Sequence, residues 1–228
     1  MEIIPAILPE DVQAIKNHLT EVMGVSKWIQ IDLCDGVFVP TQTWPYNHTD
    51  DYIFEQIMAE EEGFPYWDRF NFEADLMVKN AHESFDTFVR LGFARIVFHV
   101  EAEGDLVEFG EFLEAIDMVT RDNISIGISV GHQTPLESIY PLVNIVDFVQ
   151  IMGIEKIGIQ GEEFYPETIK RVRQLKEKFP EVTISIDGGV DYIAAKELKD
   201  AGADRLIVGS HIWNSPDIKE TIQEFEQI

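Results

Sequence analysis

The sequence has little cysteine, few basic residues and no long apolar run. Its one cysteine, Cys34, excludes an internal disulfide framework and fits a reducing compartment. No stretch approaches the roughly 18 apolar residues of a membrane-spanning helix, and the first residues lack the basic start of a signal peptide. We therefore expect a cytoplasmic protein that has no membrane partner.

Basic residues are outnumbered by acidic ones, 17 to 42, which gives a formal net charge of −25. Such a surface repels nucleic acid and anionic membranes, so we expect neither as a partner. An anionic ligand would also be repelled at long range, and its site would depend on local backbone dipoles. The charge itself is most simply explained as a solvated acidic shell.

Strand and helix signals alternate along all 228 residues without a break in composition. With 45% hydrophobic residues, the chain can bury a sizeable core. Eight alternations predict one domain, residues 1–228, folded as an α/β protein of the (β/α)8 TIM-barrel type. A doubly wound open sheet is the alternative, but it needs fewer units. We expect strands at 2–7, 27–33, 70–77, 95–100, 124–130, 146–152, 182–186 and 205–208, and helices at 10–23, 50–61, 82–91, 105–119, after Pro135, at 166–179, between the last two strands and after Asn214.

The stretch 183–213 predicts a strand, a helix and a second strand, with glycines directly after each strand. Gly188 and Gly189 follow the first strand, and Gly209 and Ser210 follow the second. Glycine lets the backbone approach an anion closely, and the loops after strands seven and eight of a barrel are a common phosphate site. These residues therefore predict phosphate binding, with a plain tight turn as the alternative for Gly188 and Gly189.

The side chains that point into a barrel follow from the period of two along each strand. On this basis the strand 27–33 turns Gln30 and Asp32 inward, and the strand 70–77 turns Asp75 inward together with Glu73 and Met77. Asp187 points inward where the strand 182–186 ends. The predicted cup contains Gln30, Asp32, Asp75 and Asp187 and is roofed by Met77 and Met152.

Three carboxylates so placed cannot all be ionised at modest cost unless a positive charge lies among them. Oxygen ligands from Asp32, Asp75, Asp187 and the amide of Gln30 favour Mg²⁺ or Mn²⁺ over a thiolate-seeking ion. One acid could instead keep its proton, or Asp75 could pair with a basic side chain from a loop. His99, which also points inward, is expected to be a hydrogen-bonded core residue rather than a ligand. His132 and His211 follow strands five and eight, and we expect neither of them to contact a ligand.

Short segments occur along the chain in an order and spacing typical of one enzyme family. They are P-A-I-L (5–8), W-I-Q-I-D-L-C-D-G-V-F-V-P (28–40), A-D-L-M-V-K-N (74–80), H-V-E-A (99–102), T-P-L-E (134–137), I-D-G-G-V (186–190) and V-G-S (208–210). Over nearly the whole chain they resemble the ribulose-phosphate 3-epimerase family. The resemblance implies a ribulose-phosphate-binding barrel that moves a proton on and off the carbon next to a ketose carbonyl.

The resemblance also implies roles for individual residues. Asp32 and Asp187 match the family's two acid/base aspartates, which exchange the proton while a metal stabilises the enediolate. Met77 and Met152 match methionines that enclose the dry side of the site. The phosphate grip matches Gly188, Gly189, Gly209 and Ser210, with Gly161 at the end of the flap that follows strand six.

The sequence departs from the family inside the expected site. Gln30 and Asp75 stand where the family has its two metal-binding histidines, and Cys34 replaces a cap methionine. Ala6 replaces a serine, and the flap 152–161 lacks the family's proline and adjacent glycine pair. A further departure is an insertion between Pro40 and Phe72 that carries Trp44, Tyr46, Tyr66 and Trp67 and suits a lid or an interface between subunits of a homo-oligomer equally well.

Two functions remain open from the sequence. The first is an isomerase, a sugar-phosphate epimerase that acts on a phosphorylated ketose with a divalent metal ion (Mg, Mn, Fe or Zn). The second is a regulatory barrel that binds a phosphorylated sugar without epimerising it. A lyase of the hexulose-phosphate synthase branch is less favoured, because Lys79 lies beyond its strand and not within a D-x-K-x-x-D motif.

Overall fold

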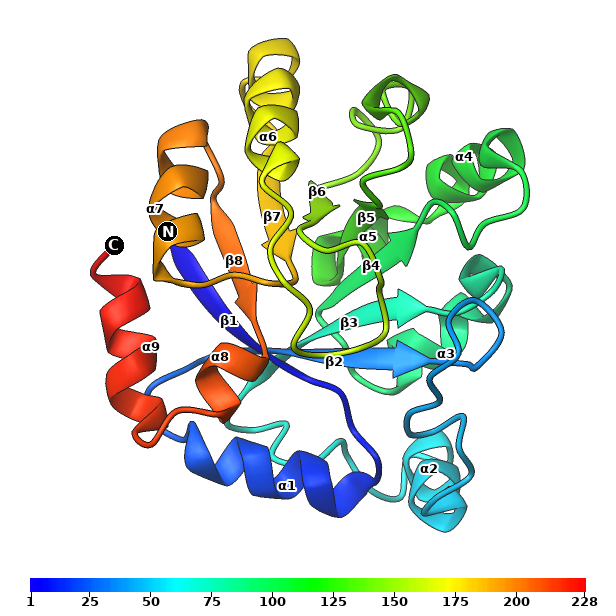
Figure 1. Cartoon of the computed structure of the whole chain (residues 1–228). Coiled ribbons are helices and arrows are strands. Elements are labelled where there is room, and N and C mark those ends of the chain that lie inside the picture. Colours follow the sequence, from blue (N-terminus) through cyan, green and yellow to red (C-terminus); the bar gives the residue numbers. More distant parts are fainter.

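Eight parallel strands close into a barrel in the computed structural model, which describes all residues 1–228 (Figure 1). Each strand pairs with the next along the chain, and β8 pairs with β1, so the open-sheet alternative is wrong. The prediction of a single TIM barrel is confirmed. The strands are β1 (Glu2–Ile7), β2 (Trp28–Cys34), β3 (Asn71–Met77), β4 (Arg95–His99), β5 (Ser125–Val130), β6 (Phe148–Met152), β7 (Thr183–Asp187) and β8 (Arg205–Val208).

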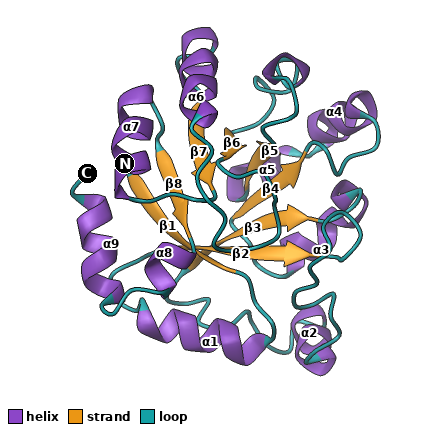
Figure 2. Cartoon of the chain, viewed as in Figure 1, coloured by secondary structure: helices purple, strands orange, loops and turns teal.

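The helices surround the barrel (Figure 2). Apolar residues on the outward face of the strands pack against them in one continuous core of 53 buried residues. None of the helices combines the length and the apolarity that crossing a bilayer requires. The helices are α1 (Val12–Glu21), α2 (Asp51–Met58), η1 (Ala81–Ser84), α3 (Phe85–Arg90), α4 (Leu106–Ala115), α5 (Met118–Asn123), η2 (Leu136–Ser138), α6 (Glu167–Lys178), α7 (Tyr192–Ala201), α8 (Ser210–Trp213) and α9 (Ile218–Glu226).

Several expected helices have different boundaries in the structure, and the one expected at 82–91 is the short helix η1 followed by α3. The helix expected at 105–119 is two helices, because the backbone of Ile116 is extended and Asp117 starts a new one. The side chain of Asp117 accepts hydrogen bonds from the backbone N–H groups of Val119 and Thr120, as a helix cap does. A short helix, α8, also begins directly at Ser210, ahead of the helix that was expected after Asn214.

The insertion between β2 and β3 divides into two parts. Trp44 is fully buried and packs its ring near the rings of Phe54 and Phe64. Trp67, in contrast, is 69% exposed and lies beside Asn71, where β3 begins. The Trp67 part therefore lies at the amino ends of the strands, opposite the barrel mouth, and the expectation of a lid is wrong for it.

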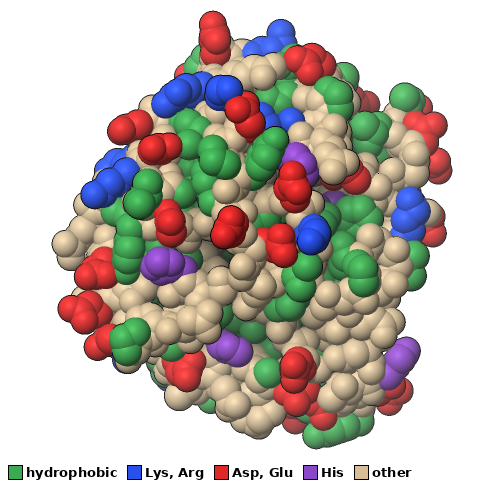
Figure 3. Space-filling model, in the orientation of Figure 1, with side chains coloured by type: hydrophobic (Ala, Val, Ile, Leu, Met, Phe, Trp, Pro, Cys, Tyr) green, Lys and Arg blue, Asp and Glu red, His purple; other side chains and the backbone are tan.

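The barrel interior has a charged layer near the amino ends of the strands. Arg95 places its guanidinium 3.1 Å from Glu2 and 3.7 Å from Glu73, and 3.5 Å from the ring centroid of Trp28. Arg205 lies 3.3 Å from the same Glu2 carboxylate. The surface is acidic as expected: acidic side chains are spread over the face in Figure 3, where basic ones are fewer.

Candidate active site

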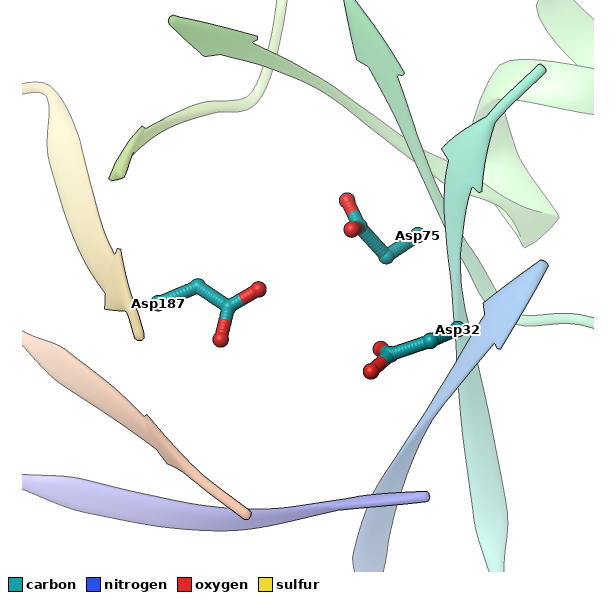
Figure 4. A group of neighbouring side chains, drawn as sticks. All are labelled: Asp32, Asp75 and Asp187. Carbon is teal, nitrogen blue, oxygen red and sulfur yellow. The ribbon is translucent and has the colours of Figure 1, made fainter. Parts of the chain in front are cut away.

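Three carboxylates meet inside the barrel, at the carboxyl ends of three strands (Figure 4). Asp32 and Asp75 are direct partners in the register of β2 and β3, and Asp187 ends β7 on the other side. One oxygen of each lies within 4.8 Å of the others. The predicted convergence of the three acids is confirmed.

A buried amide joins two of these acids. The Nε2 of Gln30 donates hydrogen bonds to Asp32 Oδ1 at 3.0 Å and to Asp187 Oδ2 at 3.2 Å. The other end of the amide, Oε1, is buried and has no hydrogen-bond partner. Gln30 therefore fixes the spacing of Asp32 and Asp187 and leaves one oxygen atom free for a further contact.

Asp75 is held from the opposite side of the barrel. The Nε2 of His99 lies 3.1 Å from both carboxylate oxygens, and Gln150 donates a hydrogen bond to Oδ1 at 3.0 Å. His99 is fully buried, so its expected place as a hydrogen-bonded core residue is confirmed. Burial lowers the pKa of His99, but the charge of Asp75 and its hydrogen bond more than offset this, so that the pKa lies above its ordinary value. No basic side chain from a loop pairs with Asp75, whose partners His99 and Gln150 both lie on strands.

The acids near the mouth are hard to ionise. Burial, followed by the charges of Asp187 and Asp75, raises the pKa of Asp32 well above its ordinary value. The same causes, burial first and Asp75 second, raise the pKa of Asp187 to about 8. At neutral pH the pair therefore favours one proton shared between two carboxyl groups, unless a cation lies among them.

The residues present fit a divalent cation. The three carboxylates and the unpartnered Oε1 of Gln30 supply only oxygen ligands, which hard cations prefer. Among basic side chains, His99 alone pairs with these acids, through Asp75, and no lysine or arginine does. A bound cation would therefore supply positive charge that Asp32 and Asp187 lack in their direct contacts.

A cavity opens directly above this centre. Asp32 and Asp187 line it, whereas Asp75 and Gln30 are fully buried beneath it. Met77 and Met152, the methionines of the expected roof, both line the cavity and are almost completely buried. The lining also includes the residues predicted to bind phosphate, which are Gly161, Gly188, Gly189, Gly209 and Ser210.

Glycine shapes the far wall of the cavity. Gly189 has a φ of +69°, and a Cβ there would lie 2.6 Å from the backbone of Phe164, in the segment between β6 and α6. That segment crosses in front of the barrel in Figure 1. It is tied down by backbone hydrogen bonds from Gly153 to Asp187 at 2.6 Å and from Tyr165 to Gly153 at 2.7 Å.

Some lining residues depart from what the sequence predicted. Gln160, within the expected flap 152–161, and Glu162 were not singled out, and His211 on the short helix α8 was not expected beside a ligand but lines the cavity. Neither segment has a strand or helix period from which side-chain direction could be read. Only their places after strands six and eight could have marked them.

A closed barrel with an acidic centre under a glycine-walled cavity defines this chain as a TIM-barrel protein with a candidate site at the carboxyl ends of its strands. Sequence comparison then identifies the family. The sequence profile of the ribulose-phosphate 3 epimerase family matches residues 2–213, and the chain belongs to this family.

Relatives with assigned names match almost the full chain. The cytoplasmic isoform of ribulose-phosphate 3-epimerase from Oryza sativa subsp. japonica is 26% identical over 225 residues, covering 97% of this chain and 91% of the rice protein. Ribulose-phosphate 3-epimerase from Schizosaccharomyces pombe is 27% identical over 226 residues, covering 97% of this chain and 90% of the yeast protein.

Solved structures share the fold at lower identity. A 3-hexulose-6-phosphate synthase matches with a TM-score of 0.66 and 14% identity, over 100% of this chain and 99% of the other. KGPDC from Streptococcus mutans in complex with D-R5P matches with a TM-score of 0.67 and 13% identity, over 99% of this chain and 95% of the other. At this identity the likeness shows the barrel fold alone.

Proposed function

We propose that this protein is a sugar-phosphate epimerase that inverts the carbon next to the carbonyl of a phosphorylated ketose. The observation that carries the proposal is the pair Asp32 and Asp187, two carboxyl groups with raised pKa values that line one cavity from separate strands. Inversion needs one group to remove a proton and another to deliver a proton to the opposite face. One acid that has lost its proton and one that keeps it provide the base and the acid at the same time.

The surrounding residues prepare this exchange. The Gln30 amide, bonded to both acids, holds the two carboxyl groups at a fixed spacing before the substrate arrives. Met77 and Met152 line the cavity and keep water from the carbon that loses its proton. Membership of the ribulose-phosphate 3-epimerase family favours ribulose 5-phosphate or a similar ketose phosphate as the substrate.

Asp32, Asp75, Asp187 and Gln30 would hold a divalent metal ion. When bound, such an ion stabilises negative charge that develops on the carbonyl oxygen of the substrate. The all-oxygen ligand set favours Mg²⁺ or Mn²⁺ over Zn²⁺ or Fe²⁺.

The other end of the substrate is placed at the glycine wall. Gly188, Gly189 and Gly209 line the cavity without side chains that would block a phosphate, and Ser210 adds only a small hydroxymethyl group. Gly161, in the segment before α6, lines the same cavity. In this position the phosphate would fix the sugar so that its reacting carbon lies between the two acids.

Solvent deuterium exchange tests the proposal. The protein is incubated in D₂O with ribulose 5-phosphate and related ketose phosphates, with Mg²⁺, Mn²⁺, Fe²⁺ or Zn²⁺ added in turn. We expect deuterium to enter the carbon next to the carbonyl, as followed by NMR. Binding of the sugars in calorimetry without any exchange would instead assign the barrel as a non-catalytic binder.

The ligand set makes a separate prediction. We expect Asp75→Asn to weaken Mn²⁺ binding at least about tenfold, because the central buried carboxylate loses its charge. Equilibrium dialysis or the electron paramagnetic resonance of free Mn²⁺ would measure the change. The exposed Asp122→Asn serves as the matched control, and an equal loss in both variants would contradict the ligand set.

A further inference from the structure

A second cavity lies far from the active site, at the amino ends of β3 and β4. It has a volume of about 480 Å³ and is enclosed by α2, the turns that follow it, and the end of α3. The helices α2 and α3 lie next to each other at the edge of the barrel (Figure 1). Arg90, at the end of α3, donates a hydrogen bond to the backbone carbonyl of Met58 at the end of α2. We name this cavity the Trp67 groove after the residue that forms its exposed wall.

The groove has an apolar floor that belongs to the core. Phe64 is buried, and its ring lies 4.6 Å from Phe72 and 5.4 Å from Phe93 between centroids. Ile57 and Phe70 complete the floor and are buried as well. A floor fixed in this way does not need to rearrange when a ligand binds.

The exposed wall is an indole that lies against Gly63. Trp67 is 69% exposed, and a Cβ on Gly63 would stand 2.5 Å from the indole Cδ1. Its backbone N–H bonds the carbonyl of Phe64 at 3.1 Å, and the neighbouring Tyr66 has a left-handed backbone with a φ of 56°. A large aromatic side chain that is both exposed and constrained is typical of a binding hot spot.

The rim of the groove is acidic. Glu60, Glu61 and Glu62 follow one another along it and are all exposed. Arg90 is the only basic residue in the lining, and it already bonds the end of α2. Three acids against one arginine leave a negative potential around an apolar floor.

From these features we propose that the Trp67 groove binds a basic polypeptide segment that carries an apolar anchor. The anchor side chain would enter the cavity over Phe64, and an arginine or lysine would lie over the Trp67 indole beside the glutamates. A second copy of this chain fits poorly, because the formal net charge of −25 makes two acidic faces repel each other.

A defined peptide tests this proposal with the full chain. The probe is a capped hexapeptide of alternating arginine and leucine, and the readouts are calorimetry and the NMR signal of the Trp67 indole N–H, assigned with Trp67→Phe. We expect binding that shifts this signal and that weakens at least about tenfold in Trp67→Ala. We expect Gly63→Ala to weaken binding too, since its Cβ displaces the indole. Sugar-phosphate turnover should be unchanged in both variants.

A matched control separates the groove from general charge attraction. The triple variant E60Q/E61Q/E62Q is compared with E108Q/E111Q/E114Q on α4, which removes the same charge elsewhere. We expect only the E60Q/E61Q/E62Q variant to lose peptide binding. Equal loss in both, unchanged binding in Trp67→Ala, or no binding at all would overturn the proposal. Dimerisation that Trp67→Ala abolishes, without peptide binding, would overturn it in favour of self-association.

Discussion

Asp32 and Asp187 both accept a hydrogen bond from the Gln30 amide, but they differ in their access to solvent. Asp32 is 7% exposed and lies directly beside Asp75 in the sheet, whereas Asp187 ends its strand at the cavity and is only partly buried. The more accessible group can exchange its proton with solvent between turnovers. If the proposed roles hold, we therefore expect Asp187 to be the acid that sets the pH dependence of the reaction.

Replacing Asp187 by asparagine removes one of the two proton-transferring groups and keeps the shape of the side chain. We expect the turnover rate to fall by about 10²-fold or more, because a positioned acid or base contributes about that much. Deuterium exchange and turnover on a ketose phosphate would measure the rate, and circular dichroism would confirm the fold. Asp122→Asn, an exposed change of the same charge, should keep the full rate. A normal rate in Asp187→Asn would refute its role.

Glu73 makes stability depend on pH. It is fully buried, and neither carboxylate oxygen has a hydrogen-bond partner. Burial raises its pKa from an ordinary value of 4.5 to about 7, although the charges of Arg95 and Arg205 lower it in part. Between these two values the folded chain keeps a proton that the unfolded chain has lost. The contribution is fully present below the lower value and is lost as the pH rises through the higher one.

We therefore expect Glu73→Gln to flatten the fall in unfolding free energy between about pH 4.5 and about pH 7, by an amount on the order of 1–3 kcal/mol. Urea denaturation of the two proteins at several pH values would measure it, and their difference removes the contributions of other groups. If the unfolding free energy changes equally with pH in both proteins, Glu73 is ionised throughout this range.

At the level of the elements, the active site depends on how the segment between β6 and α6 lies against Gly189. With a φ of +69° and the backbone of Phe164 2.6 Å from its missing Cβ, this position excludes a side chain. We expect Gly189→Ala to displace that segment and to raise KM for a phosphorylated ketose at least about tenfold, since the phosphate wall moves with it. Steady-state kinetics would measure the effect.

Gly24→Ala is the control for backbone strain alone. Gly24 has a φ of +85°, and nothing lies within 4 Å of the missing Cβ. The Gly24→Ala variant should lose about 1 kcal/mol of stability, because alanine disfavours the left-handed backbone, and its KM should not change. A similar KM increase in both variants would mean that lost stability, and not the displaced segment, is responsible.

The elements also show how far the sequence could be read. All eight strands were predictable, because each is a short apolar run between turn residues, and the period of two correctly turned Gln30, Asp32 and Asp75 inward. The break between α4 and α5 at Ile116 could not be predicted, because the apolar pattern continues across it and only the Asp117 cap marks it. Contacts that cross the barrel, such as Gln150 to Asp75, depend on the register of strands that are not neighbours in the sheet, which no local pattern contains.

For the whole molecule, the negative charge opposes the arrival of its own proposed substrate. A formal net charge of −25 repels a phosphate dianion over a distance set by the ionic strength. In the proposed site, the glycines that line the cavity would let a phosphate approach the backbone closely, and salt screens little at such short range. Long-range repulsion and short-range binding should therefore respond differently to salt.

We expect kcat/KM for a phosphorylated ketose to rise several-fold when NaCl increases from about 10 to about 150 mM, because the screening length shortens from about 30 to about 8 Å. The rise should come from faster association, so kcat measured at saturation should change little. Stopped-flow binding of the same sugar phosphate gives the association rate directly, and the same measurement with an uncharged ketose is the control. At a site whose own basic side chains attract the ligand, kcat/KM instead falls steadily as the salt concentration rises. A fall here would mean that a cation bound at Asp32, Asp75 and Asp187 dominates the field that the substrate meets as it approaches.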